Sequence, residues 1–128
     1  MWTFDDFQPG ALLGTASAII DGNDVGRWLS IYRDEPDPRP EVPAGMAMLI
    51  VMAGYARAVS PRPPGNVHAG QTLVIERVPR VGDCLSTSVR CESKAIRKGR
   101  RRLHLAVETR DHRNEICYRG IITTLWAL

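Results

Sequence analysis

The stretch that decides the fold is residues 66–85, NVHAGQTLVIERVPRVGDCL. A polar opening leads into a strand-like run, Pro79 interrupts that run, and Gly82 with Asp83 opens a second strand. Directly upstream lies the segment 44–59, which is almost wholly apolar and carries one charge, at Arg57. Because apolar side chains occur on all sides of this segment, it predicts a helix that is buried on most sides.

One strand is expected before this helix and four after it. The expected strands are residues 11–20, 67–77, 84–96, 101–110 and 116–125. Apolar and polar residues alternate along 103–110, as in a sheet with one buried face. A short amphipathic helix is expected at 25–32, followed by a loop at 34–43 that contains four prolines. This order predicts one α+β domain, residues 1–128, in which a meander of four antiparallel strands wraps the helix.

Composition limits the possible classes of protein. The 128 residues are 44% hydrophobic and 24% charged, which is typical of one globular domain. Residues 44–59 would form a helix about 24 Å long, short of the roughly 30 Å of a bilayer core, so no membrane span is expected. The first residues, MWTFDDF, lack the features of a secretory signal, and we expect a cytoplasmic protein. Three cysteines without CxxC spacing predict reduced thiols and no metal site.

The net charge is only +3, but five cations are concentrated in the run 97–102, RKGRRR. A solvated hairpin tip is the simplest interpretation of this run. A second is binding of phosphates, which guanidinium groups grip with two hydrogen bonds. Nucleic-acid binding is not expected, because no aromatic residues are interleaved with the cations.

Several motifs, taken in order and spacing, resemble the MaoC-like dehydratase branch of the hotdog superfamily. They are residues 2–10 (WTFDDFQPG), 42–46 (VPAGM), 68–71 (HAGQ), 77–83 (RVPRVGD), 94–102 and 121–126 (IITTLW). The resemblance implies a hotdog fold, in which a curved antiparallel sheet wraps one central buried helix. It also implies acyl-CoA or acyl-carrier-protein thioesters as substrates, with coenzyme A or phosphopantetheine present only as part of the substrate. A role in fatty acid metabolism and a homodimer or higher homo-oligomer follow from the same resemblance.

Enzymes of this family hydrate 2-enoyl thioesters or dehydrate the 3-hydroxy form. They carry an Asp and, five residues later, a His on the loop after the first helix, where one group takes a proton from water and the other orients it. Here Asp34 stands in the acidic position, and Arg39 stands where the family has His. An arginine stays protonated and cannot act as a base at neutral pH. The resemblance therefore implies either a hydratase with a remodelled site or a subunit that pairs with a catalytic hotdog partner, with weak or absent hydration by the isolated chain.

The candidate catalytic residues are Asp34 and His68, although a solvated loop carboxylate and a polar strand-start residue are the simpler interpretations. Gly45 and Met46 begin the expected helix, where free amides could polarise a thioester carbonyl. A tight helix entry would explain the same glycine. The candidate phosphate-binding residues are Arg97, Lys98, Arg100 and Arg101.

Two other classes of function remain open. One is a hotdog thioesterase, but many of these carry an Asp or Glu on the central helix, and residues 44–60 contain neither. The other is a hotdog protein without enzymatic activity that binds a ligand or a partner protein. Whether the chain is an enzyme therefore stays undecided, with hydro-lyase chemistry favoured by the resemblance.

Overall fold

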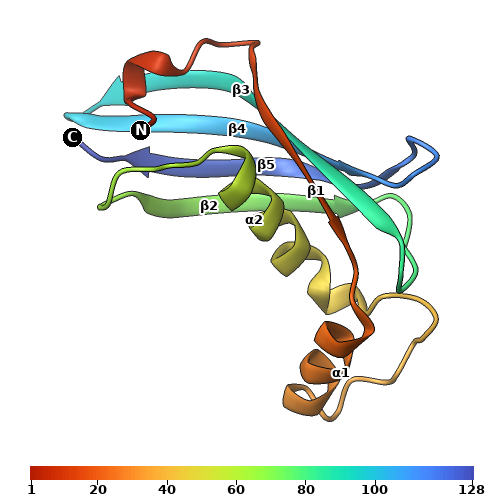
Figure 1. Ribbon diagram of the computed structural model, residues 1–128. Coiled ribbons are helices and arrows are strands. Elements are labelled where there is room, and N and C mark those ends of the chain that lie inside the picture. The colour runs from red at the N-terminus through yellow and green to blue at the C-terminus, as the bar shows by residue number, and fades with distance from the viewer.

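Five strands form one antiparallel sheet in the computed structural model, which describes residues 1–128 (Figure 1). The strands are β1 (Leu12–Ile19), β2 (Val67–Ile75), β3 (Cys84–Arg97), β4 (Arg100–Arg110) and β5 (Ile116–Trp126). Their order across the sheet is β1-β3-β4-β5-β2, which leaves β1 and β2 as the two edges. The sheet curves around a helix on one face, as expected for a hotdog fold.

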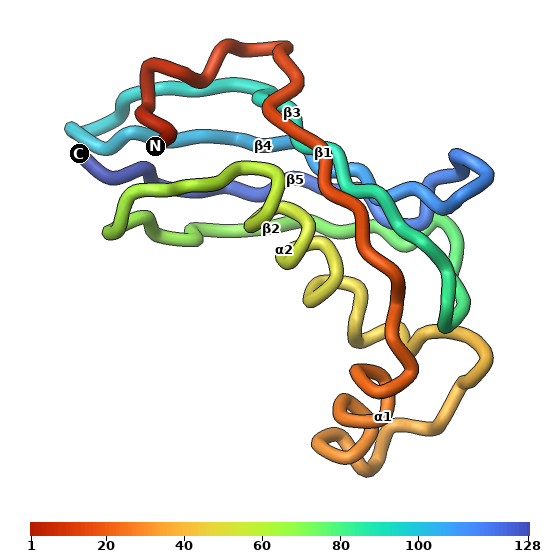
Figure 2. The backbone as a smooth tube through the Cα atoms, in the orientation of Figure 1, coloured from red at the N-terminus to blue at the C-terminus, as the bar shows by residue number.

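The predicted meander of four strands is wrong in one respect, because β2 does not pair with β3. Only β3, β4 and β5 form a meander, whereas β2 pairs with β5 at the far edge. The link between β2 and β3 is not a tight hairpin. Val42 N–H donates to the Pro79 carbonyl at 2.9 Å, and Val81 N–H donates to the Pro40 carbonyl at 2.9 Å. These bonds hold the link against the loop that precedes the helix, so the chain crosses the end of the sheet (Figure 2).

The remaining elements are helical. They are the 3₁₀ turns η1 (Phe4–Asp6) and η2 (Ala44–Met46) and the helices α1 (Gly22–Ile31) and α2 (Ala47–Ala58). Asp21 caps α1 by accepting from Asn23 N–H. The predicted central helix thus begins with a 3₁₀ turn and continues as α2. None of these helices has the length and apolar character needed to cross a membrane.

Helix α2 lies very close to the sheet, and two glycines permit this. A Cβ on Gly54 would lie 2.5 Å from Cβ of Thr87 on β3, and one on Gly14 would lie 2.4 Å from the Ala58 carbonyl oxygen. The opposite face of α2 is less buried than its composition predicts, since Leu49 and Arg57 are exposed. In a single chain, therefore, only one face of the helix is covered.

The core lies between α2 and the facing side of the sheet. Leu103, Leu105, Val107 and Thr109 are all buried, which confirms the alternation predicted for this strand. Thr109 shares a 2.7 Å hydrogen bond with the Thr87 hydroxyl, so both buried polar groups are satisfied. All three cysteines are free thiols, and burial raises the pKa of the two that lie in the core, Cys91 and Cys117.

Candidate functional site

The predicted site residues lie at two opposite ends of the sheet. Asp34, Gly45 and Met46 lie at what we call the helix end, where α2 begins and β3 starts at Cys84. The basic run lies at the hairpin end, where β3 finishes at Arg97 and turns into β4. A 14-residue strand spans about 40 Å. One chain therefore does not bring the two groups of residues together.

His68 belongs to the hairpin end. It pairs with Thr124 near the start of β2, and its Nε2 lies 2.7 Å from Oε1 of Gln71. The register of β2 shifts between His68 and Gly70, which leaves Ala69 as an extra residue. His68 and Gln71 consequently face the same side of the sheet as α2. The imidazole is exposed and far from Asp34, so these two predicted catalytic residues do not meet within one chain.

In the loop at 34–43, the two residues at the family's catalytic positions, Asp34 and Arg39, do not interact with each other. Asp34 is exposed and takes part in no hydrogen bond or ion pair. Arg39 instead forms an ion pair with Asp37, and its Nε–H donates to both carboxylate oxygens at 2.9 and 3.0 Å. This side-chain contact, together with the Arg39 backbone N–H, lowers the pKa of Asp37 to about 2. Arg39 is thus paired with a carboxylate of its own loop.

Glu35 is the residue that the sequence did not single out. It is half-buried, whereas the three other acidic residues of the loop are exposed. The indole Nε1 of Trp28, on α1, donates to Oε2 of Glu35 at 2.8 Å. Trp28 also packs against Tyr32, with ring centroids 4.3 Å apart and ring planes tilted by 39°. One sequence signal exists, because an indole N–H that becomes partly buried requires an acceptor.

Gly45 lies directly against this pair. A Cβ on Gly45 would lie 2.8 Å from the Trp28 ring and 3.5 Å from each carboxylate oxygen of Glu35. Met46 N–H already donates to the Pro43 carbonyl at 3.0 Å, inside the 3₁₀ turn. Gly45 N–H has no acceptor within the chain. Of the two amides predicted to polarise a carbonyl, Gly45 is therefore the open one, and a carboxylate lies beside it.

An apolar cavity of about 260 Å³ lies between β1 and α2. Ala16, Ala18, Leu49 and Leu85 supply parts of its wall, and Met46 borders it at the helix end. Concave apolar sites with a few polar groups at the rim are typical of small-ligand pockets. The cavity therefore suits an apolar group attached to a ligand that enters at the start of α2.

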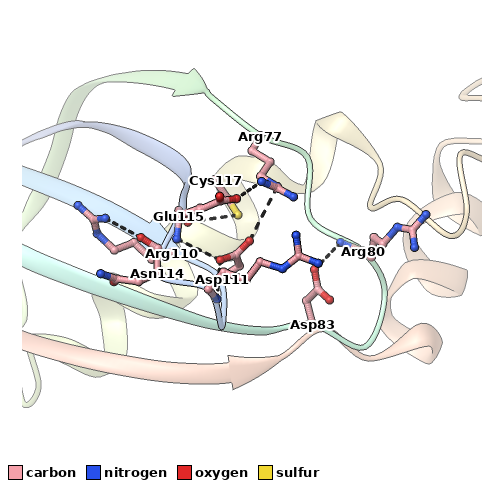
Figure 3. A network of polar contacts seen from close by, with 9 residues as sticks. Arg77, Arg80, Asp83, Arg110, Asp111, Asn114, Glu115 and Cys117 are labelled. Carbon is pink, nitrogen blue, oxygen red and sulfur yellow. Dashed lines mark hydrogen bonds and ion pairs between the residues drawn. The ribbon is translucent and has the colours of Figure 1, made fainter.

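A network of ion pairs fixes the turns next to the helix end (Figure 3). Arg77 pairs with Glu115 and, at 3.9 Å, with Asp111, whose side chain is only 6% exposed. Asp83 accepts from Arg80 N–H at 2.9 Å and closes the Gly-Asp turn before β3. These contacts tie the end of β2 to the turn between β4 and β5. The link between β2 and β3 is in turn bonded to the loop before α2, through Val42 N–H and the Pro79 carbonyl.

The basic run is only partly free. Lys98 and Gly99 have φ values of 50° and 74°, which form a two-residue hairpin turn with left-handed backbone at both positions. Arg101 is half-buried and donates to the Ala127 carbonyl at 3.4 Å. Within this run, three exposed side chains have no hydrogen-bond or ion-pair partner, namely Arg97, Lys98 and Arg100.

Comparison with known proteins gives structural matches only. No family model matches the chain, and no curated protein sequence is similar to it. A MaoC-like dehydratase from Rhodospirillum rubrum has a TM-score of 0.78 at 17% identity, over 97% of this chain and 96% of that one. An R-hydratase from Pseudomonas aeruginosa has a TM-score of 0.74 at 17% identity, over 96% and 84%. A thioesterase complexed with coenzyme A and Zn from Thermus thermophilus has a TM-score of 0.64 at 14% identity, over 92% and 86%.

At these identities the likeness establishes the fold alone. The chain has the hotdog fold, in the form shared with MaoC-like dehydratases, as the motifs predicted. Dehydratases, hydratases and thioesterases all occur among these structures. Because one fold carries several chemistries, the function has to be argued from the residues at the site.

Proposed function

We propose that the protein binds acyl thioesters of coenzyme A or acyl-carrier protein and belongs functionally with the enoyl-thioester hydratases and dehydratases. The observation that carries this proposal is the start of the central helix, where Gly45 N–H is open beside an apolar cavity. A helix N-terminus favours the charge that develops on a thioester oxygen. The carbonyl would lie at Gly45, and the acyl chain would extend past Met46 into the cavity.

The complete site would require two subunits. Strand β2 is an open edge with exposed apolar side chains at Val67, Val74 and Ile75, and such an edge favours pairing with another strand. In an antiparallel pair of β2 strands, the start of one lies beside the end of the other. A second copy's His68 and basic hairpin would then approach the helix end of the first copy. The proposed assembly is a homodimer, or a heterodimer with a related hotdog subunit, and it would join the two ends that one chain keeps apart.

Thioester hydrolysis is the alternative, and the likeness to a thioesterase favours testing it. Against it, α2 carries no Asp or Glu. The carboxylate beside Gly45 comes from the preceding loop, at Glu35. Arg39 in place of the family's His also supports the role of a partner subunit with little chemistry of its own.

Calorimetric titration with crotonyl-CoA and with free coenzyme A tests the proposal. We expect saturable binding of both, and tighter binding of the thioester because only it fills the cavity and reaches Gly45. Loss of the enoyl absorbance measures hydration, and release of free thiol measures hydrolysis. Absence of saturable binding to thioesters on either carrier would overturn the proposal, and thiol release without hydration would favour the alternative.

A further inference from the structure

We propose that Glu35 is the carboxylate that moves the proton in this site and that Trp28 positions it. This inference rests on the proposed function, since it assigns roles within the same thioester site. It replaces Asp34, the position that the family resemblance indicates, with the neighbouring residue. The structure distinguishes the two carboxylates by burial and by hydrogen bonding, and it places Glu35 beside Gly45.

Of these two carboxylates, only Glu35 has the geometry of an oriented base. Its Oε2 accepts from the Trp28 indole at 2.8 Å, while its Oε1 makes no hydrogen bond within the chain. Both oxygens lie 3.5 Å from the position of a Cβ on Gly45. Asp34 is exposed and has no contact that would orient it. One fixed oxygen and one open oxygen let a carboxylate accept a proton in a defined direction.

The chemical step balances with this single carboxylate. Oε1 of Glu35 takes a proton from water while the water oxygen forms a bond to C3 of the enoyl group. The electrons of the C2–C3 double bond move towards the thioester carbonyl, whose oxygen receives a hydrogen bond from Gly45 N–H. The enolate collapses, and C2 takes the proton from Glu35, which returns as a carboxylate. Water has then been added across the double bond, and dehydration is the same path reversed.

We expect a slow reaction, because Glu35 alone replaces the Asp and His that share proton transfer in the family. General acid–base groups typically contribute about 10²–10⁴-fold each, so hydration by the isolated protein should fall below about 1 per second. This agrees with the weak activity expected from Arg39. The assay therefore uses protein at a concentration close to that of crotonyl-CoA.

The test compares Glu35→Gln with a matched control, Glu41→Gln. Glutamine keeps the shape of Glu35 and still accepts from Trp28, but it cannot take a proton. We expect hydration to fall at least about tenfold while crotonyl-CoA binding and melting temperature stay unchanged. Glu41 is an exposed glutamate of the same loop, with no side-chain hydrogen bond or ion pair, so its variant should keep the full rate.

Trp28→Phe tests the positioning role through coupling. It should lower kcat several-fold without changing thioester affinity, and it should have no further effect in the Glu35→Gln background. Losses that simply add in the double variant would show that Trp28 acts on the fold and not through Glu35.

The failures are distinguishable. Thioester binding without any hydration, an unchanged rate in Glu35→Gln, or a loss in Asp34→Asn instead would overturn the role of Glu35 and leave the proposed function standing. Absence of thioester binding in the calorimeter would overturn both.

Discussion

The two ends of the sheet place their charges in opposite ways. At the helix end, the Glu35 carboxylate is fixed by Trp28, and Arg77 is fixed by two carboxylates. At the hairpin end, Arg97 and Arg100 project into solvent without partners, and only a two-residue turn sets their position. Proton transfer requires a fixed geometry, whereas attraction of phosphates requires only nearby positive charge. We therefore propose that chemistry belongs to the helix end and electrostatic capture to the hairpin end.

The largest effect is expected from breaking the proposed dimer, which would separate the helix end of one copy from the hairpin end of the other. Val74→Lys places a charge on the open β2 edge and should give a monomer that binds thioesters at least about tenfold more weakly. Leu12→Lys changes a similarly exposed residue on the other edge, β1, and should leave the dimer intact. Light scattering at micromolar concentration, with calorimetry, measures both effects. A wild-type protein that is strictly monomeric would contradict the proposed assembly.

The next test concerns packing at the helix end alone. Gly45→Ala places a Cβ 2.8 Å from the Trp28 ring and should reduce the free energy of unfolding by about 1–3 kcal/mol. It should also weaken thioester binding. Gly26, inside α1, has nothing within 4 Å of a Cβ, so Gly26→Ala should instead stabilise the protein by about 0.5–1 kcal/mol. Chemical denaturation of the two variants compares them directly, and equal effects would contradict the close contact at Gly45.

The contribution of the hairpin end to coenzyme A binding should depend mainly on salt concentration. Replacing Arg97 and Arg100 by Ala should weaken coenzyme A binding by about threefold to tenfold at low ionic strength and flatten its salt dependence. The melting temperature should change by no more than a few degrees. Arg90, an exposed arginine in the middle of β3, provides the control substitution. An unchanged affinity at low salt would return the run to its simplest interpretation, a solvated tip.

The smallest effect is expected in the loop between the two helices. In Arg39→Ala the pKa of Asp37 should rise from about 2 towards 3.8, remaining below it because the backbone N–H of residue 39 still donates. A lowered pKa adds stability that is present above the unfolded value and is lost as the pH falls towards 2. The melting temperature near pH 7 should nevertheless hardly change, since both side chains are exposed and a surface ion pair contributes little to stability. An NMR titration of the Asp37 carboxyl measures the shift.

Local sequence patterns predicted the helices and strands of this fold well, but they did not predict how the strands pair in the sheet. The five strands lie within two residues of their predicted bounds, because alternation such as that of residues 103–110 is a local property. The position of β2 next to β5 was missed, because this pairing joins residues that are far apart in the chain, such as Gln71 and Ile122. Glu35 was missed for a different reason, because its partners are nearby in sequence but are brought together only by the path of the folded loop. Its burial is created by Trp28 and Gly45, and nothing in the loop sequence distinguishes it from Asp34.

The extra residue at Ala69 also has an evolutionary consequence. In a regular strand, two residues three positions apart point to opposite faces, but the shift of register puts His68 and Gln71 on the same one. Deleting Ala69 would shorten the strand by one residue and would keep both His68 and Gln71. The deletion would also leave the imidazole on the face of α2, because it removes the bulge and residues two positions apart in a regular strand share a face. In related sequences, this histidine and glutamine should therefore be three positions apart only where the strand carries the bulge, and two positions apart where it does not.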